Sequence, residues 1–173
     1  MPNLQSNVRS DARIFVIDDE PIITSVLEAY LANVGYNNTH IFNDSVEAIE
    51  TLEKTGADLI VTDVNMPELG GRFLAKLIRK DPRFQLTPII VVTSEGTPES
   101  IQSLEQFNIC QVLTKPIDGQ EFVTKVNIAI ENYRDEIERQ KNEQSAARQL
   151  TMEKTLRSEQ SVRALFNREK TTT

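Results

Sequence analysis

The chain of 173 residues is long enough for one ordinary domain with a hydrophobic core and a substantial appendage, but too short for two full domains. Its formal net charge of −7 is unfavourable for a surface that neutralises nucleic-acid phosphate, so we expect no direct binding of nucleic acid. No signal-peptide pattern opens the sequence and no apolar run approaches the roughly 20 residues that span a bilayer, which predicts a cytoplasmic protein without a membrane segment. The single cysteine, Cys110, lies in an apolar stretch, where we expect it to be buried as a small hydrophobic residue rather than to act as a reactive thiol.

The opening residues 1–11 are polar and predict a flexible tail. Five short runs rich in apolar and β-branched residues then follow and predict strands, at 14–17, 39–42, 59–62, 89–93 and 109–113. The segments between them carry apolar residues at steps of three and four, which predict helices, and the first of these helices should end with Gly35 as its C-cap. Strands that are apolar on both faces and alternate with helices indicate a doubly wound α/β domain with a parallel sheet.

A fifth helix should begin near Asp118, because no proline or glycine occurs from Gln120 to Thr173. It should continue as one long exposed helix on the order of 50 residues, or about 75 Å at 1.5 Å per residue. We therefore divide the chain into a tail at 1–11, one domain at 12–130 and a helical extension at 131–173.

Polar residues follow four of the five predicted strands, at the edge where doubly wound sheets hold their ligands. These residues are Asp18, Asp19 and Glu20, then Asp63, then Thr93 and Ser94, and finally Lys115. Each has an ordinary structural explanation. The acids before Pro21 could cap a helix, Asp63 could be a turn residue, Thr93 a strand residue and Lys115 a solvated charge.

Their joint occurrence favours a phosphoryl-transfer pocket. Clustered carboxylates repel one another unless a cation lies among them, and hard oxygen ligands suit Mg²⁺. One carboxylate can then attack a phosphoryl group to give an aspartyl phosphate, while donors such as Lys115 and Thr93 stabilise the phosphoryl oxygens.

The acidic pair, the segment Asp-Val-Asn-Met-Pro-Glu-Leu-Gly-Gly at 63–71, Thr93 and Lys115-Pro116 resemble the receiver domain of bacterial two-component response regulators over residues 12–130. The resemblance implies a flavodoxin-like five-stranded sheet of order 2-1-3-4-5. It also implies phosphorylation on Asp63 by a histidine kinase or a histidine phosphotransfer protein. Mg²⁺ would then be bound by the side chains of Asp19 and Asp63, the carbonyl of Asn65 and, through water, Asp18. Thr93 would be the switch hydroxyl, Lys115 the phosphate-pairing cation, and the Lys115-Pro116 bond cis.

Four further positions bear on the resemblance. Asn65 and Glu95 match the pair found in chemotaxis-type receivers, which implies a labile phosphoryl group. Val112 departs from the family, because receivers usually carry Tyr or Phe three residues before the lysine. The usual threonine-aromatic relay is therefore in question. The only histidine, His40, lies in the second predicted strand, so a phosphohistidine donor should be another protein.

We expect a signalling domain that is not an enzyme beyond its own phosphorylation and dephosphorylation, and that passes its state through the long helix. Two alternatives stay open within this class: a free-standing phosphorelay intermediate, and the receiver fragment of a larger regulator whose output domain is missing. A haloacid-dehalogenase-like phosphatase is a third alternative from another class, but it needs a second acid where this chain has Asn65.

The helix also predicts a homodimer, formed by pairing along one apolar stripe that becomes polar after Ile137. Its inner face would carry the series Val123, Val126, Ile130, Tyr133 and Ile137, with a change of register near Leu150 and later apolar residues at Met152, Leu156, Val162, Leu165 and Phe166. A solvated helix that frays beyond Ile137 is the alternative.

Overall fold

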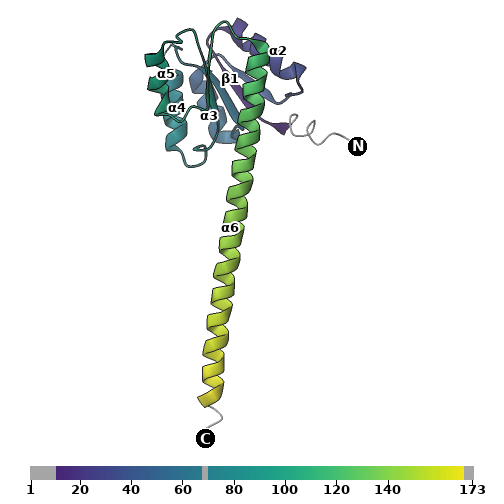
Figure 1. Ribbon diagram of the computed structural model, residues 1–173, viewed down its shortest axis with the longest axis vertical. Coiled ribbons are helices and arrows are strands. Elements are labelled where there is room, and N and C mark those ends of the chain that lie inside the picture. The colour runs from purple at the N-terminus through teal and green to yellow at the C-terminus, as the bar shows by residue number, and fades with distance from the viewer. Residues whose placement is uncertain (1–10, 68–69, 170–173) are drawn as a thin grey trace. The chain divides into compact units, whose positions relative to one another are not determined.

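The computed structural model describes residues 11–67 and 70–169, with no account of the side chains of 105 and 161–169. Strands and helices alternate strictly along the described chain (Figure 1). The elements are β1 (Ile14–Ile17), α2 (Pro21–Asn33), β2 (Thr39–Phe42), α3 (Ser45–Thr55), β3 (Leu59–Asp63), α4 (Gly71–Lys80), β4 (Ile89–Thr93), α5 (Pro98–Glu105), β5 (Gln111–Thr114) and α6 (Gly119–Glu169). The predicted tail at 1–11 lies outside the described residues except for Asp11, as do Glu68, Leu69 and residues 170–173.

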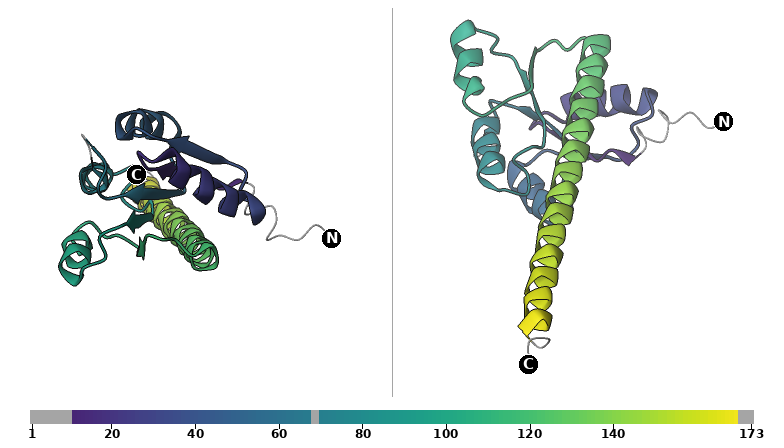
Figure 2. Two further views of the ribbon diagram at one scale, coloured as in Figure 1. Left: turned by 90° about the horizontal axis from the view of Figure 1, so that it is seen from above. Right: turned by 60° about the horizontal axis from the view of Figure 1, so that its bottom comes forward.

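All five strands pair in parallel in the order β2-β1-β3-β4-β5, which confirms the predicted sheet. Every residue of β1, β3 and β4 is buried, as expected of inner strands covered on both faces. Helices α3, α4 and α5 pack on one face, and α2 with the first part of α6 packs on the other (Figure 2).

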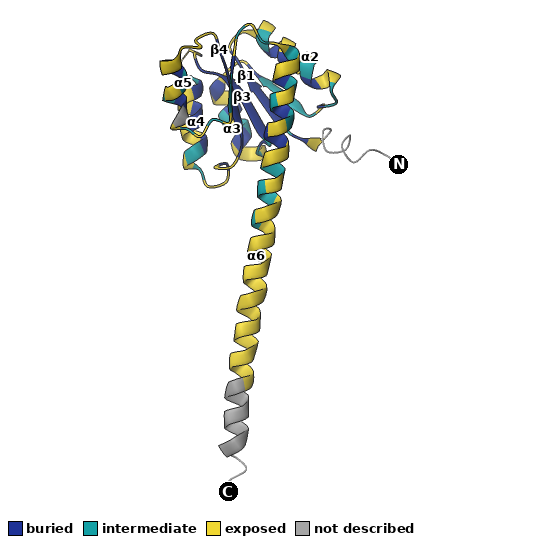
Figure 3. Cartoon of the chain, viewed as in Figure 1, coloured by how far each residue is buried: buried dark blue, intermediate teal, exposed yellow. Residues whose placement is uncertain are grey.

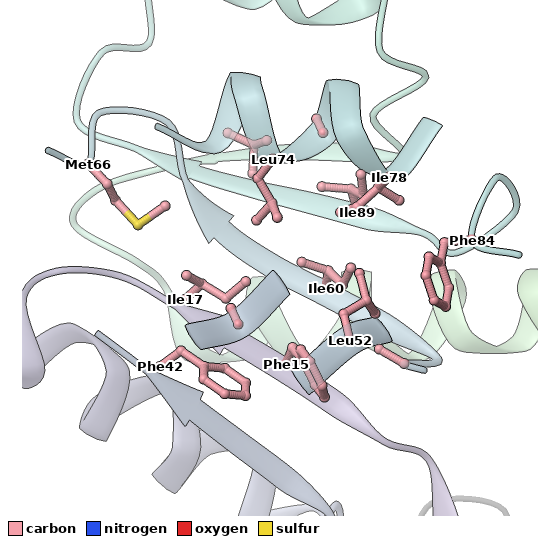
Figure 4. Packing of buried hydrophobic residues seen from close by; sticks show 14 of the residues in the cluster. Phe15, Ile17, Phe42, Leu52, Ile60, Met66, Leu74, Ile78, Phe84 and Ile89 are labelled. Carbon is pink, nitrogen blue, oxygen red and sulfur yellow. The ribbon is translucent and has the colours of Figure 1, made fainter. Parts of the chain in front are cut away.

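Each face of the sheet is covered by its own hydrophobic cluster. On the face of α3 and α4, side chains such as Phe15 and Ile60 of the sheet meet Leu52 and Leu74 of the helices (Figure 4). Alternate residues of the same strands point to the other cluster, because successive side chains of a strand face opposite ways. The two clusters pack both faces of the strands, so the carboxyl ends of the strands are held at one edge of the sheet.

The structure corrects three local predictions. The fifth strand begins at Gln111 rather than Ile109, and Cys110 is exposed rather than buried. The thiol of Cys110 nevertheless lies 3.1 Å from the carbonyl oxygen of Ile89, which accepts its hydrogen bond. At the end of α2 the C-cap is Val34, and Gly35 follows it with a φ of 94°, the left-handed conformation that glycine adopts most readily.

Helix α6 has two environments along its length (Figure 3). Asp118 caps its start, since the Asp118 carboxylate accepts a hydrogen bond from the Glu121 amide at 2.8 Å. Phe122, Val126 and Ile130 are then buried against the sheet, whereas every residue from 141 to 160 is exposed. The chain accordingly divides into two compact units, Met1–Tyr133 and Arg134–Thr173.

This division corrects part of the predicted dimer stripe. Val126 and Ile130 are buried within the first unit, and Val123 is partly buried against the same cluster, so these residues are unavailable to a second helix. The side chains of Val162, Leu165 and Phe166, which the prediction also used, lie outside the described residues. Within the described part of the chain, no helix has the length and apolar character needed to cross a bilayer.

Candidate functional site

The carboxyl ends of the parallel strands bring the predicted polar residues to one edge of the sheet. Ile17 of β1 pairs with Thr62 of β3, so the residues that follow, Asp18 and Asp63, are neighbours. On the other side of β3, Asp63 pairs with Val92 of β4, one residue before Thr93. Both acids are buried almost completely, and the site is therefore a carboxylate pair set into the top of the sheet.

Lys115 is the cation of this site. Its Nζ atom lies 2.9 Å from Asp18 Oδ2, 3.0 Å from Glu20 Oε1 and 3.3 Å from Asp63 Oδ2. The residue reaches these partners from the end of β5, where its amide donates a 2.8 Å hydrogen bond to the carbonyl oxygen of Thr93. One ammonium thus compensates three carboxylates, which leaves a net negative charge in the site.

The electrostatic balance differs between the lysine and the buried acid. Burial alone would lower the pKa of Lys115, but the carboxylates of Asp18, Glu20 and Asp63 outweigh it and hold that pKa above its ordinary value. For Asp18, burial dominates and raises the pKa, although the Lys115 ammonium and the Glu20 amide oppose the shift. Asp18 is therefore a carboxylate whose negative charge is only partly compensated.

Asp63 is held by its own loop and by α4. Its Oδ1 atom accepts a hydrogen bond from the Asn65 amide at 3.2 Å, which fixes the carboxylate at the start of the loop. Helix α4 approaches the backbone of Asp63 so closely that a Cβ atom on Gly71 would lie 2.1 Å from the Asp63 carbonyl oxygen. Glycine is required at this position because no side chain fits there.

Comparison with known proteins identifies the family that shares this arrangement. Residues 14–127 match the response regulator receiver domain, which is well over half of the chain. This chain is a member of the response regulator receiver domain family.

Relatives of the receiver domain include chemotaxis proteins of two organisms. The chain is 27% identical over 124 residues to chemotaxis protein CheY-3 of Vibrio cholerae, covering 72% of this chain and 95% of that protein. It is 29% identical over 119 residues to chemotaxis protein CheY1 of Helicobacter pylori, covering 68% and 96%. Among solved structures, Vibrio cholerae CheY4 is 27% identical with a TM-score of 0.64, covering 68% of this chain and 98% of that one.

Within this receiver domain, the structure separates the predicted metal ligands. Asp18 and Asp63 come together, and Asn65 contacts Asp63 through its amide. Asp19 is exposed and is absent from the group of carboxylates that could share one ion, whose third member is Glu20. The sequence pattern suggested for Glu20 only a helix cap and no role as a metal ligand, and its position directly after the acidic pair was the only available signal.

Thr93 lies fully buried at the end of β4. Its hydroxyl accepts a hydrogen bond at 3.0 Å from the Glu95 amide, so it is engaged with the loop that follows β4. Val112, which replaces the aromatic residue usual in receiver domains, is partly buried against the cluster on the face of α3 and α4. The Lys115-Pro116 bond is cis, as predicted.

The receiver site fits a divalent cation on its own chemistry. Asp18 Oδ2 is buried and accepts no well-directed hydrogen bond from the described residues, although Lys115 Nζ lies near it. Oxygen atoms of Asp18, Glu20 and Asp63 all lie within 4.8 Å of one another. Such a set of hard oxygen ligands with excess negative charge suits Mg²⁺.

His40 is not part of this site. It lies in β2, where its ring contacts the Asn38 side chain and the Phe15 ring.

Proposed function

We propose that this receiver domain accepts a phosphoryl group on Asp63 from the phosphohistidine of a histidine kinase or a histidine phosphotransfer protein. The observation that supports the proposal best is the contact of one lysine, Lys115, with both Asp63 and a second buried carboxylate, Asp18. A carboxylate held by a cation at the carboxyl edge of a parallel sheet is placed for attack on an incoming phosphoryl group. Membership of the receiver family supports the same reading over the phosphatase alternative.

Each polar residue then has a distinct task in the transfer. The Asp63 carboxylate forms the new bond to phosphorus while the bond to the histidine nitrogen breaks. Lys115 donates to an oxygen of the transferred group, and the Thr93 hydroxyl, whose oxygen accepts from the Glu95 amide, donates its hydrogen to another phosphoryl oxygen. Asp19, Asp63, the carbonyl of Asn65 and, through water, Asp18 would hold Mg²⁺, which would supply positive charge against the phosphoryl oxygens.

The output of the domain is a change of state rather than a released product. We propose that switching proceeds through the loop after β4 and through helix repacking, because Val112 offers no aromatic ring to rotate with Thr93. The state would be relayed by α6, which begins within the receiver and continues beyond it. A free-standing phosphorelay intermediate and a fragment of a larger regulator are the alternatives that share this chemistry, and we place both in the cytoplasm with the kinase.

Intact mass spectrometry with acetyl phosphate tests the proposal. In the presence of Mg²⁺ the protein should gain about 80 Da, corresponding to one phosphoryl group. The Asp63→Asn variant and the wild-type protein in excess chelator should gain nothing. A modification that persists unchanged in Asp63→Asn would exclude Asp63 as the acceptor, and continuous hydrolysis of a phosphate ester would favour a phosphatase instead.

A further inference from the structure

The third carboxylate at Lys115 differs from the other two in its exposure. The side chains of Asp18 and Asp63 are 2% and 7% exposed, whereas that of Glu20 is 62% exposed. Glu20 is the N-cap residue of α2, yet its side chain makes no capping hydrogen bond to the helix. Its Oε1 atom instead accepts a hydrogen bond from Lys115 at 3.0 Å. The carboxylate therefore serves the site rather than the helix.

The ammonium group of Lys115 has three N–H donors and three carboxylate neighbours. Lys115 Nζ donates hydrogen bonds to Glu20 and Asp63 and forms an ion pair with Asp18, so an oxygen of a phosphoryl group on Asp63 must compete with these carboxylates for the ammonium. Asp18 is buried and would lose its counter-ion without gaining water, and Asp63 carries the phosphoryl group itself. Glu20 is solvated, so its contact is the one that breaks at the lowest cost.

We propose that Glu20 is a positioning residue that holds the Lys115 ammonium at the exposed side of the site until a phosphoryl group replaces the Glu20 carboxylate as its partner. This inference rests on the proposed phosphorylation of Asp63. It adds that the Glu20 carboxylate competes with the phosphoryl group for Lys115. In the unmodified protein Glu20 occupies a donor of Lys115, and its charge faces the incoming anion. Because the Glu20 carboxylate must be displaced, both the affinity for the phosphoryl group and the rate of transfer are lowered. Glu20 thus sets a threshold for activation.

The test compares Glu20→Gln with the wild-type protein in binding beryllofluoride, a phosphoryl mimic, by isothermal titration calorimetry with Mg²⁺. Because an exposed ion pair contributes up to about 1 kcal/mol, the variant should bind beryllofluoride about two- to fivefold more tightly. Its phosphorylation by acetyl phosphate should be accelerated by a similar factor. The gain should shrink at high salt, since exposed charges are screened. Glu20→Asp, which keeps the charge on a shorter arm, should lie between the two proteins.

Two further proteins isolate the mechanism. Glu28→Gln removes the same charge from an exposed position on α2 and should leave both measurements unchanged. In a Lys115→Met background, Glu20→Gln should give no gain, because the lysine through which Glu20 acts is absent. An equal gain in that background would mean simple charge repulsion and would overturn the proposal.

The remaining outcomes are equally decisive. Unchanged or weaker binding of beryllofluoride by Glu20→Gln would contradict the proposal, and a loss of Mg²⁺ affinity specific to this variant would assign Glu20 to the metal instead. These results leave the phosphoacceptor role of Asp63 intact. A wild-type protein that neither binds beryllofluoride nor reacts with acetyl phosphate would instead overturn the proposed function itself.

Discussion

At the scale of single residues, the receiver site is an excess of negative charge held in place by one lysine. The negative charge of Asp18 is compensated only in part, because the residue is buried and its Oδ2 atom accepts no well-directed hydrogen bond within the described chain. Asp63 lies beside it with an amide hydrogen bond and the same lysine. This arrangement suits a cation, and under the proposed function it also receives a phosphoryl group.

Asp19 is among the Mg²⁺ ligands that the family resemblance implies, but it is absent from the group of carboxylates that lie close together in the structure. The residue is exposed next to Asp18, and its carboxylate is available to an ion without any loss of a described contact. We predict that Asp19→Ala weakens Mg²⁺ binding at least several-fold, as titration calorimetry would measure. Glu28→Ala serves as the control for loss of an exposed carboxylate, since Glu28 is exposed on α2. If Asp19→Ala bound Mg²⁺ as tightly as the wild-type protein, Asp19 would not be a ligand of the metal ion.

Lys115 gives a prediction for stability and its dependence on pH. Because the carboxylates raise its pKa in the folded state, its contribution is fully present below the ordinary lysine pKa of about 10.4 and is lost as pH rises beyond it. Without divalent ions, Lys115→Met should lower the free energy of unfolding by about 1 to 3 kcal/mol. The deficit should stay constant from about pH 7 to pH 10 and shrink only above that range.

Urea denaturation at a series of pH values measures this deficit. Lys125→Met is the control, since Lys125 forms only a 3.5 Å ion pair with an exposed glutamate on α6 and a 3.0 Å hydrogen bond to the neutral Gln111 side chain. Its loss should cost less than about 1 kcal/mol. A Lys115→Met deficit that disappeared between neutral pH and pH 9 would show that the carboxylates do not raise the pKa of the lysine.

At the scale of elements, helix α6 changes its role along its length. Its first turns complete the hydrophobic cluster that α2 forms on one face of the sheet, and its later turns are exposed. Pairs such as Arg139 and Glu136, three residues apart and 2.6 Å between charged atoms, stabilise the exposed part only weakly. The same helix is thus a core element of the receiver and, further along, a solvated segment.

Two truncations of side chains in α6 measure this difference. Phe122 is fully buried, and Phe122→Ala should lower the free energy of unfolding by about 3 to 5 kcal/mol. Leu150 is 54% exposed, and at concentrations low enough to keep the chain monomeric Leu150→Ala on the same helix should change it by less than about 0.5 kcal/mol. Equal losses in chemical denaturation would mean that the second unit is packed as firmly as the first.

At the scale of the whole molecule, the helical extension is where assembly is expected. Residues 131–173 hold 9 basic and 8 acidic residues, so the negative charge of the chain is concentrated before them. Leu150, Met152 and Leu156 are large apolar side chains that remain exposed on α6. A lone helix with this surface would fray in water, and pairing would cover these residues.

We predict a homodimer of the full chain and a monomer of a truncation that ends at Tyr133. Because Val126 and Ile130 are buried within the receiver, pairing should depend on residues beyond Ile137. Light scattering of both proteins, with and without beryllofluoride, measures this difference. If both were monomers at tens of micromolar, the extension would be a severed linker or a segment that binds another protein.

The amino-acid sequence by itself predicted the parallel α/β architecture, most strand positions and the placement of Asp63, Thr93 and Lys115 at one edge of the sheet. These features follow from local patterns, because apolar runs, turn residues and polar residues after strands are read from short segments. Tertiary structure decided the contact of Glu20 with Lys115, which joins residues 95 positions apart. It also decided that Cys110 is exposed and that the apolar stripe at the start of α6 faces its own sheet. Periodicity shows that a helix face is apolar, but the surface that covers this face is set by packing between distant segments.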